Sequence, residues 1–227
     1  MIGIIRVLTI DDAEILQAHG RLLEKEYGLP TLSRCIPDQP RGIYDEATEA
    51  LARPKIIALA QQMAAEGCRG ILISCAADPA LDEVRAEVPV PVVGAGSAGA
   101  AVALALGGRV GVLSITPDVP APIARVLGDR VVAVARPQGV TNTTHLLEPG
   151  ARDRAVDAAR GLVQQGADVI LFGCTGFVTV GVAPRIRAEL GVPVVDPVLA
   201  AGLILRYATD TNPALPRDPL NPQRSVR

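Results

Sequence analysis

Two apolar segments of this chain resemble each other and lie 99 residues apart. Residues 67–75 read GCRGILISC, and residues 166–174 read GADVILFGC. A second pair follows, because Pro91-Val92-Val93 recurs as Pro193-Val194-Val195, and each is followed by a run of small residues. Self-similarity of this kind is the mark of a duplicated fold. We therefore expect two similar halves, each with its own strands and helices.

Short apolar runs alternate with longer amphipathic or Ala-rich stretches, which is typical of parallel α/β architecture. The pattern predicts strands at 2–8, 31–35, 70–75, 90–93, 109–114, 130–135, 169–173 and 193–195. It predicts helices at 12–26, 46–66, 80–87, 97–106, 119–127, 151–165, 179–189 and 197–209. We expect an α/β protein with two pseudo-symmetric lobes, each a four-stranded parallel sheet flanked by helices, and a cleft between the lobes.

The chain is expected to pass between the two lobes twice. We assign residues 1–97 and 200–227 to the lobe that carries Cys75, and residues 98–199 to the lobe that carries Cys174. The segment 212–227 contains four prolines and is predicted to be a tail.

Composition limits the kind of protein and its partners. With 49% hydrophobic and 20% charged residues, the 227-residue chain can bury a substantial core. It has no membrane-spanning apolar run and no signal-peptide pattern, so we expect a cytoplasmic protein with free thiols. A net charge of −2 without a basic stripe argues against nucleic acid. We expect a small-molecule substrate, no nucleic-acid or membrane partner, and a homo-oligomer.

Lysine and histidine are scarce, which narrows the chemistry. Only Lys25 and Lys55 could form a Schiff base with pyridoxal phosphate, and both fall in polar helical stretches. Neither His19 nor His145 belongs to a metal-ligand spacing, and the cysteines include no C-x-x-C pair. We therefore expect no cofactor and no metal, which leaves the thiols as the best candidates for chemistry.

Cys75 and Cys174 occupy equivalent strand ends, where parallel sheets place their functional loops. One free cysteine is often only a small buried hydrophobe, but a symmetric pair favours function. The helix expected after each thiol would lower its pKa and support a thiolate base. Two such thiols facing one cleft suit removal and return of a proton at a stereocentre. Cys35 and Cys68 lack this symmetry, and we interpret them as structural.

Small and polar residues beyond other strands are further candidates. Residues 94–99 (GAGSAG) match the dinucleotide pattern G-x-G-x-x-G, but no acidic residue ends the next strand, so close helix packing is the simpler interpretation. Thr143 lies in a polar turn that is either structural or substrate-binding. Arg34 lies in a loop that could cover the cleft and pair with an anionic substrate. The predicted substrate-binding residues are Thr9, Ala76, Ala77, Gly96, Ser97, Thr143, Thr175 and Gly176.

These motifs resemble the aspartate/glutamate/hydantoin racemase superfamily, and within it the hydantoin-racemase-like branch. The resemblance covers roughly residues 2–207, and it is carried by segments 74–79 (SCAADP), 173–176 (GCTG) and 195–197 (VDP). It implies a two-lobed α/β enzyme that works without pyridoxal phosphate or metal. It also implies that Cys75 and Cys174 act as acid and base.

Two departures from the superfamily's amino-acid racemases bear on the substrate. In those enzymes the first cysteine is usually followed by Asn-Thr, whereas here it is followed by Ala76 and Ala77. Glutamate racemases usually have a histidine at the position that Gly176 occupies here. The resemblance therefore implies a cofactor-independent racemase of a 5-substituted hydantoin or related cyclic amide. The alternatives are an aspartate or glutamate racemase, a cysteine-dependent decarboxylase or cis-trans isomerase of small diacids, and a ligand-binding protein without enzymatic activity.

Overall fold

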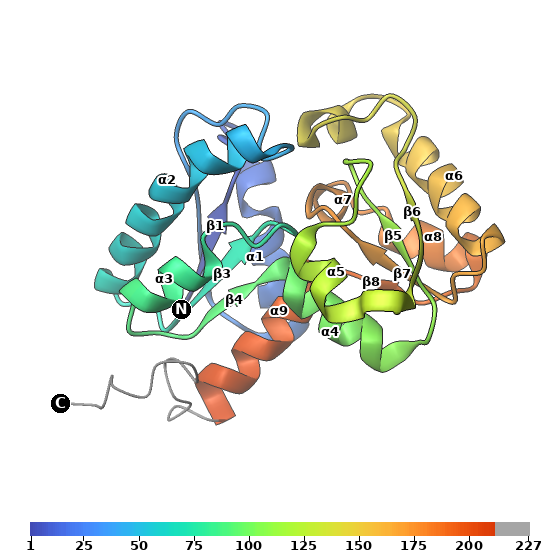
Figure 1. Ribbon diagram of the computed structural model, residues 1–227. Coiled ribbons are helices and arrows are strands. Elements are labelled where there is room, and N and C mark those ends of the chain that lie inside the picture. The colour runs from blue at the N-terminus through green and yellow to red at the C-terminus, as the bar shows by residue number, and fades with distance from the viewer. Residues whose placement is uncertain (212–227) are drawn as a thin grey trace.

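The computed structural model describes residues 1–211, and the predicted tail at 212–227 lies outside the described residues. Two parallel four-stranded sheets organise the two halves (Figure 1). Their strands are β1 (Ile2–Arg6), β2 (Thr31–Cys35), β3 (Gly70–Ser74), β4 (Val92–Gly94), β5 (Val110–Leu113), β6 (Val131–Ala135), β7 (Val169–Phe172) and β8 (Val194–Val195). The strand orders are β2-β1-β3-β4 and β6-β5-β7-β8, which are equivalent. The predicted pair of similar α/β halves is confirmed.

Nine α-helices connect these strands within residues 1–211. They are α1 (Ala13–Tyr27), α2 (Glu46–Ala65), α3 (Leu81–Glu87), α4 (Ala95–Leu106), α5 (Ala121–Leu127), α6 (Ala151–Gln164), α7 (Gly176–Thr179), α8 (Ala183–Leu190) and α9 (Pro197–Arg206). Short 3-10 turns lie at Gly128–Arg130 and Thr143–Leu147, and a π-helical turn follows α9 at Tyr207–Thr211. None of the helices in this part of the chain is long and apolar enough to cross a membrane.

The helix predicted at 179–189 corresponds to α8, which begins four residues later, and a separate short helix, α7, precedes it. Gly181 lies between α7 and α8 with φ of 64°, a left-handed conformation that interrupts a helix. Pro184 then stands in the first turn of α8, where its missing N–H costs no hydrogen bond.

Helices α4 and α9 exchange sheets at the junction of the two halves. Helix α4 follows β4 of the first sheet but packs against α5 and β7, whereas α9 follows β8 and packs against α1, β3 and β4. The two helices also pack on each other (Figure 1). A Cβ atom at Gly99 would approach Leu171 to 2.9 Å and Pro197 to 3.1 Å, so this junction requires a small residue. We propose on this basis that the lobes divide at 97/98 and 199/200.

The two faces of the first sheet bury different sets of apolar residues. Ile2, Ile4 and Leu72 pack toward α1 and α9, and Ile5 and Ile73 pack toward α2 and α3. Strands buried on both faces are near-continuous apolar runs, as the sequence shows here. Since side chains alternate along a strand, Arg6 and Ser74 continue the α1 face.

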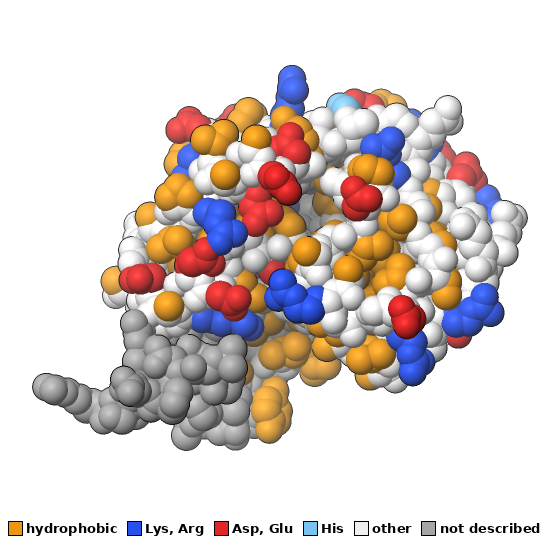
Figure 2. All heavy atoms as spheres, viewed as in Figure 1, with side chains coloured by type: hydrophobic (Ala, Val, Ile, Leu, Met, Phe, Trp, Pro, Cys, Tyr) orange, Lys and Arg blue, Asp and Glu red, His pale blue; other side chains and the backbone are white. Residues whose placement is uncertain are grey.

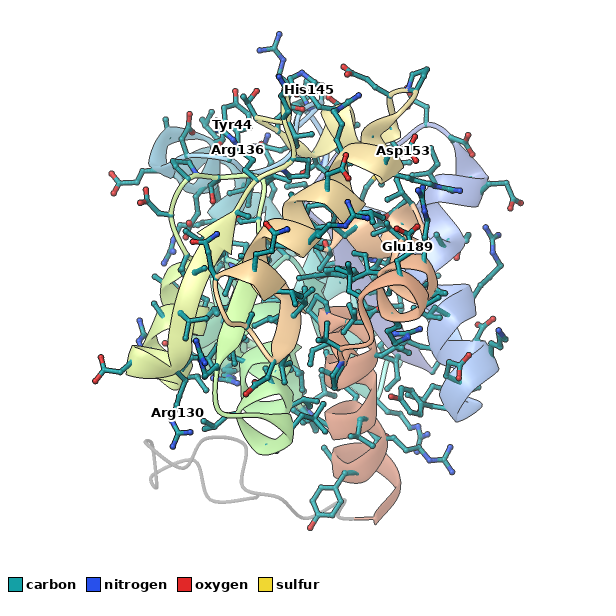
Figure 3. The ribbon with its side chains drawn as sticks, turned by 90° about the vertical axis from the view of Figure 1, so that its right-hand side faces the viewer. Tyr44, Arg130, Arg136, His145, Asp153 and Glu189 are labelled. Carbon is teal, nitrogen blue, oxygen red and sulfur yellow. The ribbon has the colours of Figure 1, made fainter. Side chains whose placement is uncertain are left out.

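The outer face of the second half carries an ion-pair network between helices. Arg185 of α8 pairs with Asp153 of α6 and, at 2.7 Å, with Glu189. Glu189 also pairs with Arg160 of α6 at 3.0 Å. Figure 3 shows Asp153 and Glu189 on this face. Exposed pairs of this kind stabilise a protein only weakly, so the apolar core dominates the packing of α6 and α8.

Candidate active site

A cavity of about 540 Å³ opens where the carboxyl ends of the two sheets meet, which is the end where parallel sheets carry their sites. Residues from both halves line it: Cys75 to Ala77 follow β3, and Cys174 to Gly176 follow β7. Ile43 to Glu49 before and within α2 and Ile115 to Ala121 after β5 complete the wall. The volume suits a small molecule. Both predicted catalytic thiols therefore line a single cavity.

Cys174 is buried, and two donors lie near its sulfur atom. The N–H of Gly176 donates to Cys174 Sγ at 3.3 Å, and the hydroxyl of Thr143 lies 3.9 Å from the same sulfur. Burial raises the pKa of the Cys174 thiol. Three groups lower this pKa because each favours a thiolate: the Gly176 N–H, the Thr143 hydroxyl and the charge of Arg6.

Cys75 is half-buried and has a matching backbone contact. The N–H of Ala77, two residues further along, lowers the pKa of its thiol, as the N–H of Gly176 does for Cys174. Burial raises the pKa of Cys75 well above its ordinary value, and the Ala77 N–H only partly offsets this. Negative charge at Cys174, Asp78 and Glu49 raises it further. The two thiols thus have equivalent backbone contacts and different electrostatic surroundings.

The expectation that a helix N-terminus supports each thiolate is wrong for Cys75. After Cys75 the chain makes turns, and α3 begins only at Leu81. After Cys174, the four-residue helix α7 begins at Gly176, and the N–H of this first helical residue donates to the sulfur. At Cys75 the backbone N–H of Ala77, which belongs to a turn, has this effect on the sulfur.

Thr175 and Ser74 connect the two halves behind the cavity. Thr175 lines the cavity as predicted, but its hydroxyl donates to the carbonyl of Ser74 at 3.0 Å. A hydroxyl has one proton, so in this arrangement Thr175 does not also donate to a bound molecule. Its oxygen can still accept a hydrogen bond.

A buried polar network that sequence reasoning missed lies behind the two thiols. His19 of α1 contacts Ser74 Oγ through Nδ1 at 2.7 Å and Thr179 Oγ1 through Nε2 at 2.9 Å. Burial, followed by the charge of Arg6, holds the pKa of His19 well below its usual value, so the ring is neutral. The network joins the residue before Cys75 to the end of α7. In sequence, His19 shows only the periodicity of an ordinary helix, which gives no signal for this contact.

Several predicted residues lie outside the cavity lining. The Thr9 hydroxyl donates to the carbonyl of Ile36 and accepts from the N–H of Gln39, so it fastens two loops together. Arg34 pairs with Glu66 at 2.7 Å instead of covering the cleft. By contrast, other residues predicted to bind substrate line the cavity: Ala76, Ala77, Thr143, Thr175 and Gly176.

The glycine-rich segment at 94–99 receives a carboxylate of the protein itself. The N–H groups of Gly96 and Ser97 donate to Asp78 Oδ1 at 2.7 Å and to Asp78 Oδ2 at 2.8 Å. A Cβ atom at Gly94 would lie 2.3 Å from Asp78 Cγ, and one at Gly96 would lie 2.0 Å from the carbonyl oxygen of Ala76. These glycines therefore make room for the loop after Cys75, and Gly96 and Ser97 hold that loop rather than lining the cavity.

The equivalent helix of the second half is capped by its own residue. Asp196 precedes α9, and Asp196 Oδ1 accepts from the N–H groups of Val198 and Leu199 at 2.8 and 3.0 Å. Burial raises the pKa of Asp196 to about 6 and also raises that of Asp78. Each half thus places a buried carboxylate at the start of the exchanged helix, from different points in the sequence.

The cavity rim is acidic, whereas the floor near the thiols is largely apolar. Asp45, Glu46 and Glu49 lie on the α2 side, and Asp118 lies on the opposite loop. Figure 2 shows acidic side chains on both sides of a hollow between the halves. Arg6 is the cation in the lining, and it is buried. Within residues 1–211 no three His, Cys, Asp or Glu side chains converge closely enough to hold a metal.

Comparisons with known proteins agree with this geometry. The allantoin racemase of Klebsiella pneumoniae has the same fold, with a TM-score of 0.80 and 22% identity over 91% of this chain and 86% of its own. The hydantoin racemase of Paenarthrobacter aurescens is 35% identical over 136 residues, which is 57% of each chain. The hydantoin racemase of Rhizobium meliloti is 27% identical over 172 residues, 72% of this chain and 70% of that protein.

The first of these hydantoin racemases is matched over little more than half of its length, so its name alone does not assign a substrate here. The family comparison covers far more of the chain. Residues 15–202, which hold both thiols and every strand except β1, match the family described as Asp/Glu/Hydantoin racemase. The two similar halves around one thiol-lined cavity agree with this match, and the chain belongs to the Asp/Glu/hydantoin racemase family.

Proposed function

We propose that this enzyme racemises a 5-substituted hydantoin or a related cyclic amide, with Cys75 and Cys174 as the two acid-base groups. The observation that carries the proposal is the pair of equivalent thiols lining one cavity. Gly176 N–H donates to Cys174 Sγ, and the N–H of Ala77, at the same place after Cys75, also favours a thiolate, which suits groups that alternate between thiol and thiolate.

The reaction needs one thiolate and one thiol. The thiolate takes the proton from the stereocentre, and the C–H electron pair moves into the adjacent ring carbonyl as an enolate. The opposing thiol then gives its proton to the other face of that carbon, and the electron pair returns from the enolate. The two sulfurs have then exchanged protonation states, and the other enantiomer runs the same steps in reverse. Burial raises the pKa of both thiols, which makes each thiolate a stronger base toward a weakly acidic C–H group.

The choice of a cyclic amide rests on what the cavity wall offers. Ala76 and Ala77 have no side-chain donor for a free α-carboxylate, and their loop is held by Asp78 instead. A hydantoin delocalises the developing charge into its own carbonyls, so it asks less of the protein than a free amino acid does. The names of the two curated relatives support the same substrate class.

The test is a deuterium exchange screen in D₂O. Single enantiomers of several 5-substituted hydantoins, allantoin, aspartate and glutamate are each incubated with the enzyme and then separated on a chiral column with mass detection. We expect the hydantoins to lose optical activity and gain one deuterium. Exchange confined to aspartate or glutamate would overturn the choice of substrate, and loss of carbon dioxide from an added arylmalonate or other diacid would favour a decarboxylase. A Cys35→Ser variant serves as the matched thiol control and is expected to keep full activity.

A further inference from the structure

The two halves differ at one charged position beside the cavity. In the first sheet Arg6 pairs with Ser74, the residue before Cys75. In the second sheet Leu113 pairs with Phe172, two residues before Cys174. The position equivalent to Arg6 is therefore the residue after Leu113, which is Ser114. One half places an arginine where the other places a serine.

Arg6 is buried at the junction of the two halves. Its Nη1 donates to the carbonyls of Ile15 and Leu16 at 2.8 and 3.0 Å, and its Nη2 donates to Thr179 Oγ1 at 3.2 Å. Thr179 ends α7, the short helix that follows Cys174. All three acceptors are uncharged, so these bonds hold the guanidinium in place without neutralising it. Burial lowers the pKa of Arg6 to about 10, which leaves it charged at neutral pH.

Strand alternation directs Arg6 away from Cys75. Arg6 and Ser74 share the α1 face, whereas Cys75 packs with the apolar residues on the α2 and α3 face. Arg6 instead reaches α7 of the other half, beside Cys174. Ser114 offers Cys75 nothing comparable, because its short hydroxyl group bonds Thr116 at 3.0 Å.

The other charges around the cavity are acidic. Asp78 and Glu49 act on Cys75, and both carboxylates disfavour a thiolate there. His19 is neutral, and Cys35 on β2 is a second thiol within reach of the Arg6 charge. The remaining titratable groups of the lining are Tyr44, Asp45, Glu46 and Asp118.

We propose that Arg6 is a positioning residue that makes the two thiols unequal, so that Cys174 loses its proton at lower pH than Cys75 does and supplies the thiolate of the reactive form of the enzyme. The direction agrees with the surroundings of each sulfur: a buried guanidinium and two hydrogen-bond donors at Cys174, and carboxylates at Cys75. The use of this asymmetry in racemisation rests on the proposed function. The form with a Cys174 thiolate accepts the enantiomer whose C–H bond points at Cys174, and the opposite enantiomer requires the proton of Cys75 to move to Cys174 first.

The asymmetry can be measured without any substrate, so its failure and that of the proposed function are distinguishable. The protein is exposed to iodoacetamide at a series of pH values, quenched and digested with trypsin, and each thiol is quantified by mass spectrometry. Cys35, Cys68, Cys75 and Cys174 fall in four different tryptic peptides. The pH at which each modification rate rises reports thiolate formation, independently of how accessible the sulfur is.

In the wild type we expect the rate at Cys174 to rise at lower pH than the rate at Cys75. In Arg6→Gln the ratio of Cys174 to Cys75 modification at neutral pH should fall by about tenfold, because a nearby opposite charge is lost. Arg6→Lys keeps the charge with fewer hydrogen bonds and should retain most of the ratio. Arg34→Gln removes a surface charge on the same sheet and should leave the ratio unchanged.

A folded Arg6→Gln protein with an unchanged ratio would overturn the proposal, as would an equal loss in Arg6→Lys. If Arg6→Gln does not fold, the wild type alone decides the question. Modification of Cys75 that rises at the same pH as that of Cys174, or lower, would show that the thiols are not ordered as proposed.

Discussion

We expect the carboxylates that cap α4 and α9, Asp78 and Asp196, to respond differently to the same substitution. Asp78 uses both oxygens, Oδ1 for the N–H of Gly96 and Oδ2 for that of Ser97. Asp196 uses Oδ1 alone for both of its N–H groups. Asparagine keeps one acceptor oxygen and replaces the other with an NH₂ group. Asp196→Asn can therefore keep both hydrogen bonds, whereas Asp78→Asn sets an N–H donor against another donor.

The magnitude follows from this count. A buried N–H that loses its acceptor costs about 1–3 kcal/mol. Both substitutions also remove a negative charge from a site that is shielded from water, which stabilises the folded protein. This gain is similar in the two variants, so it largely cancels when their free energies of unfolding are compared. We therefore expect Asp78→Asn to be less stable than Asp196→Asn by about 1–3 kcal/mol at pH 7. Because Asp78 holds the loop after Cys75, Asp78→Asn should also lower racemase activity more than Asp196→Asn does.

The assay is urea unfolding of the wild type and both variants, followed by circular dichroism, with the slopes compared so that only the midpoints carry the difference. Asp78→Ala, which removes both acceptors, should be less stable again. Equal stability of the two asparagine variants, or a less stable Asp196→Asn, would refute the reasoning from acceptor geometry.

Three further predictions concern the thiols, the second carboxylate and the buried histidine. Cys75→Ser and Cys174→Ser should each abolish net racemisation. Each variant should still exchange deuterium into one enantiomer, and the two variants should prefer opposite enantiomers. Wild-type racemisation in either variant would contradict this prediction. The folded pKa of Asp196 lies near 6, above its unfolded value, so between these values the folded state holds a proton that the unfolded state has lost. Stability should therefore fall as the pH rises from about 4 to about 6. In Asp196→Asn the midpoint of urea unfolding should depend less on pH over this range. The same pH dependence as in the wild type would show that Asp196 is not the group responsible. His19→Phe strips Ser74 and Thr179 of a shared partner and should cost about 2–3 kcal/mol in the same assay, whereas an unaltered midpoint would show that the network is dispensable.

The sequence alone determined the two α/β halves and the place of the thiols. Strand and helix periods depend on residues a few positions apart, so apolar runs such as 70–75 and 169–173 show the strands directly. The duplication then makes the two sheets equivalent, and a residue that ends a parallel strand must lie at the sheet's carboxyl edge. Cys75 and Cys174 follow from these local facts, as do Thr143 and Thr175 beside the cavity.

The tertiary structure alone decided which groups surround the thiols. The contact between Arg6 and Thr179 joins residues 173 positions apart, and that between Thr175 and Ser74 joins residues 101 apart. Nothing in local periodicity encodes such pairs, because they exist only after the halves pack and α4 and α9 exchange sheets. For the same reason Gly96 and Ser97 suggest a ligand site in sequence, whereas in the fold they bind Asp78, a residue of another loop.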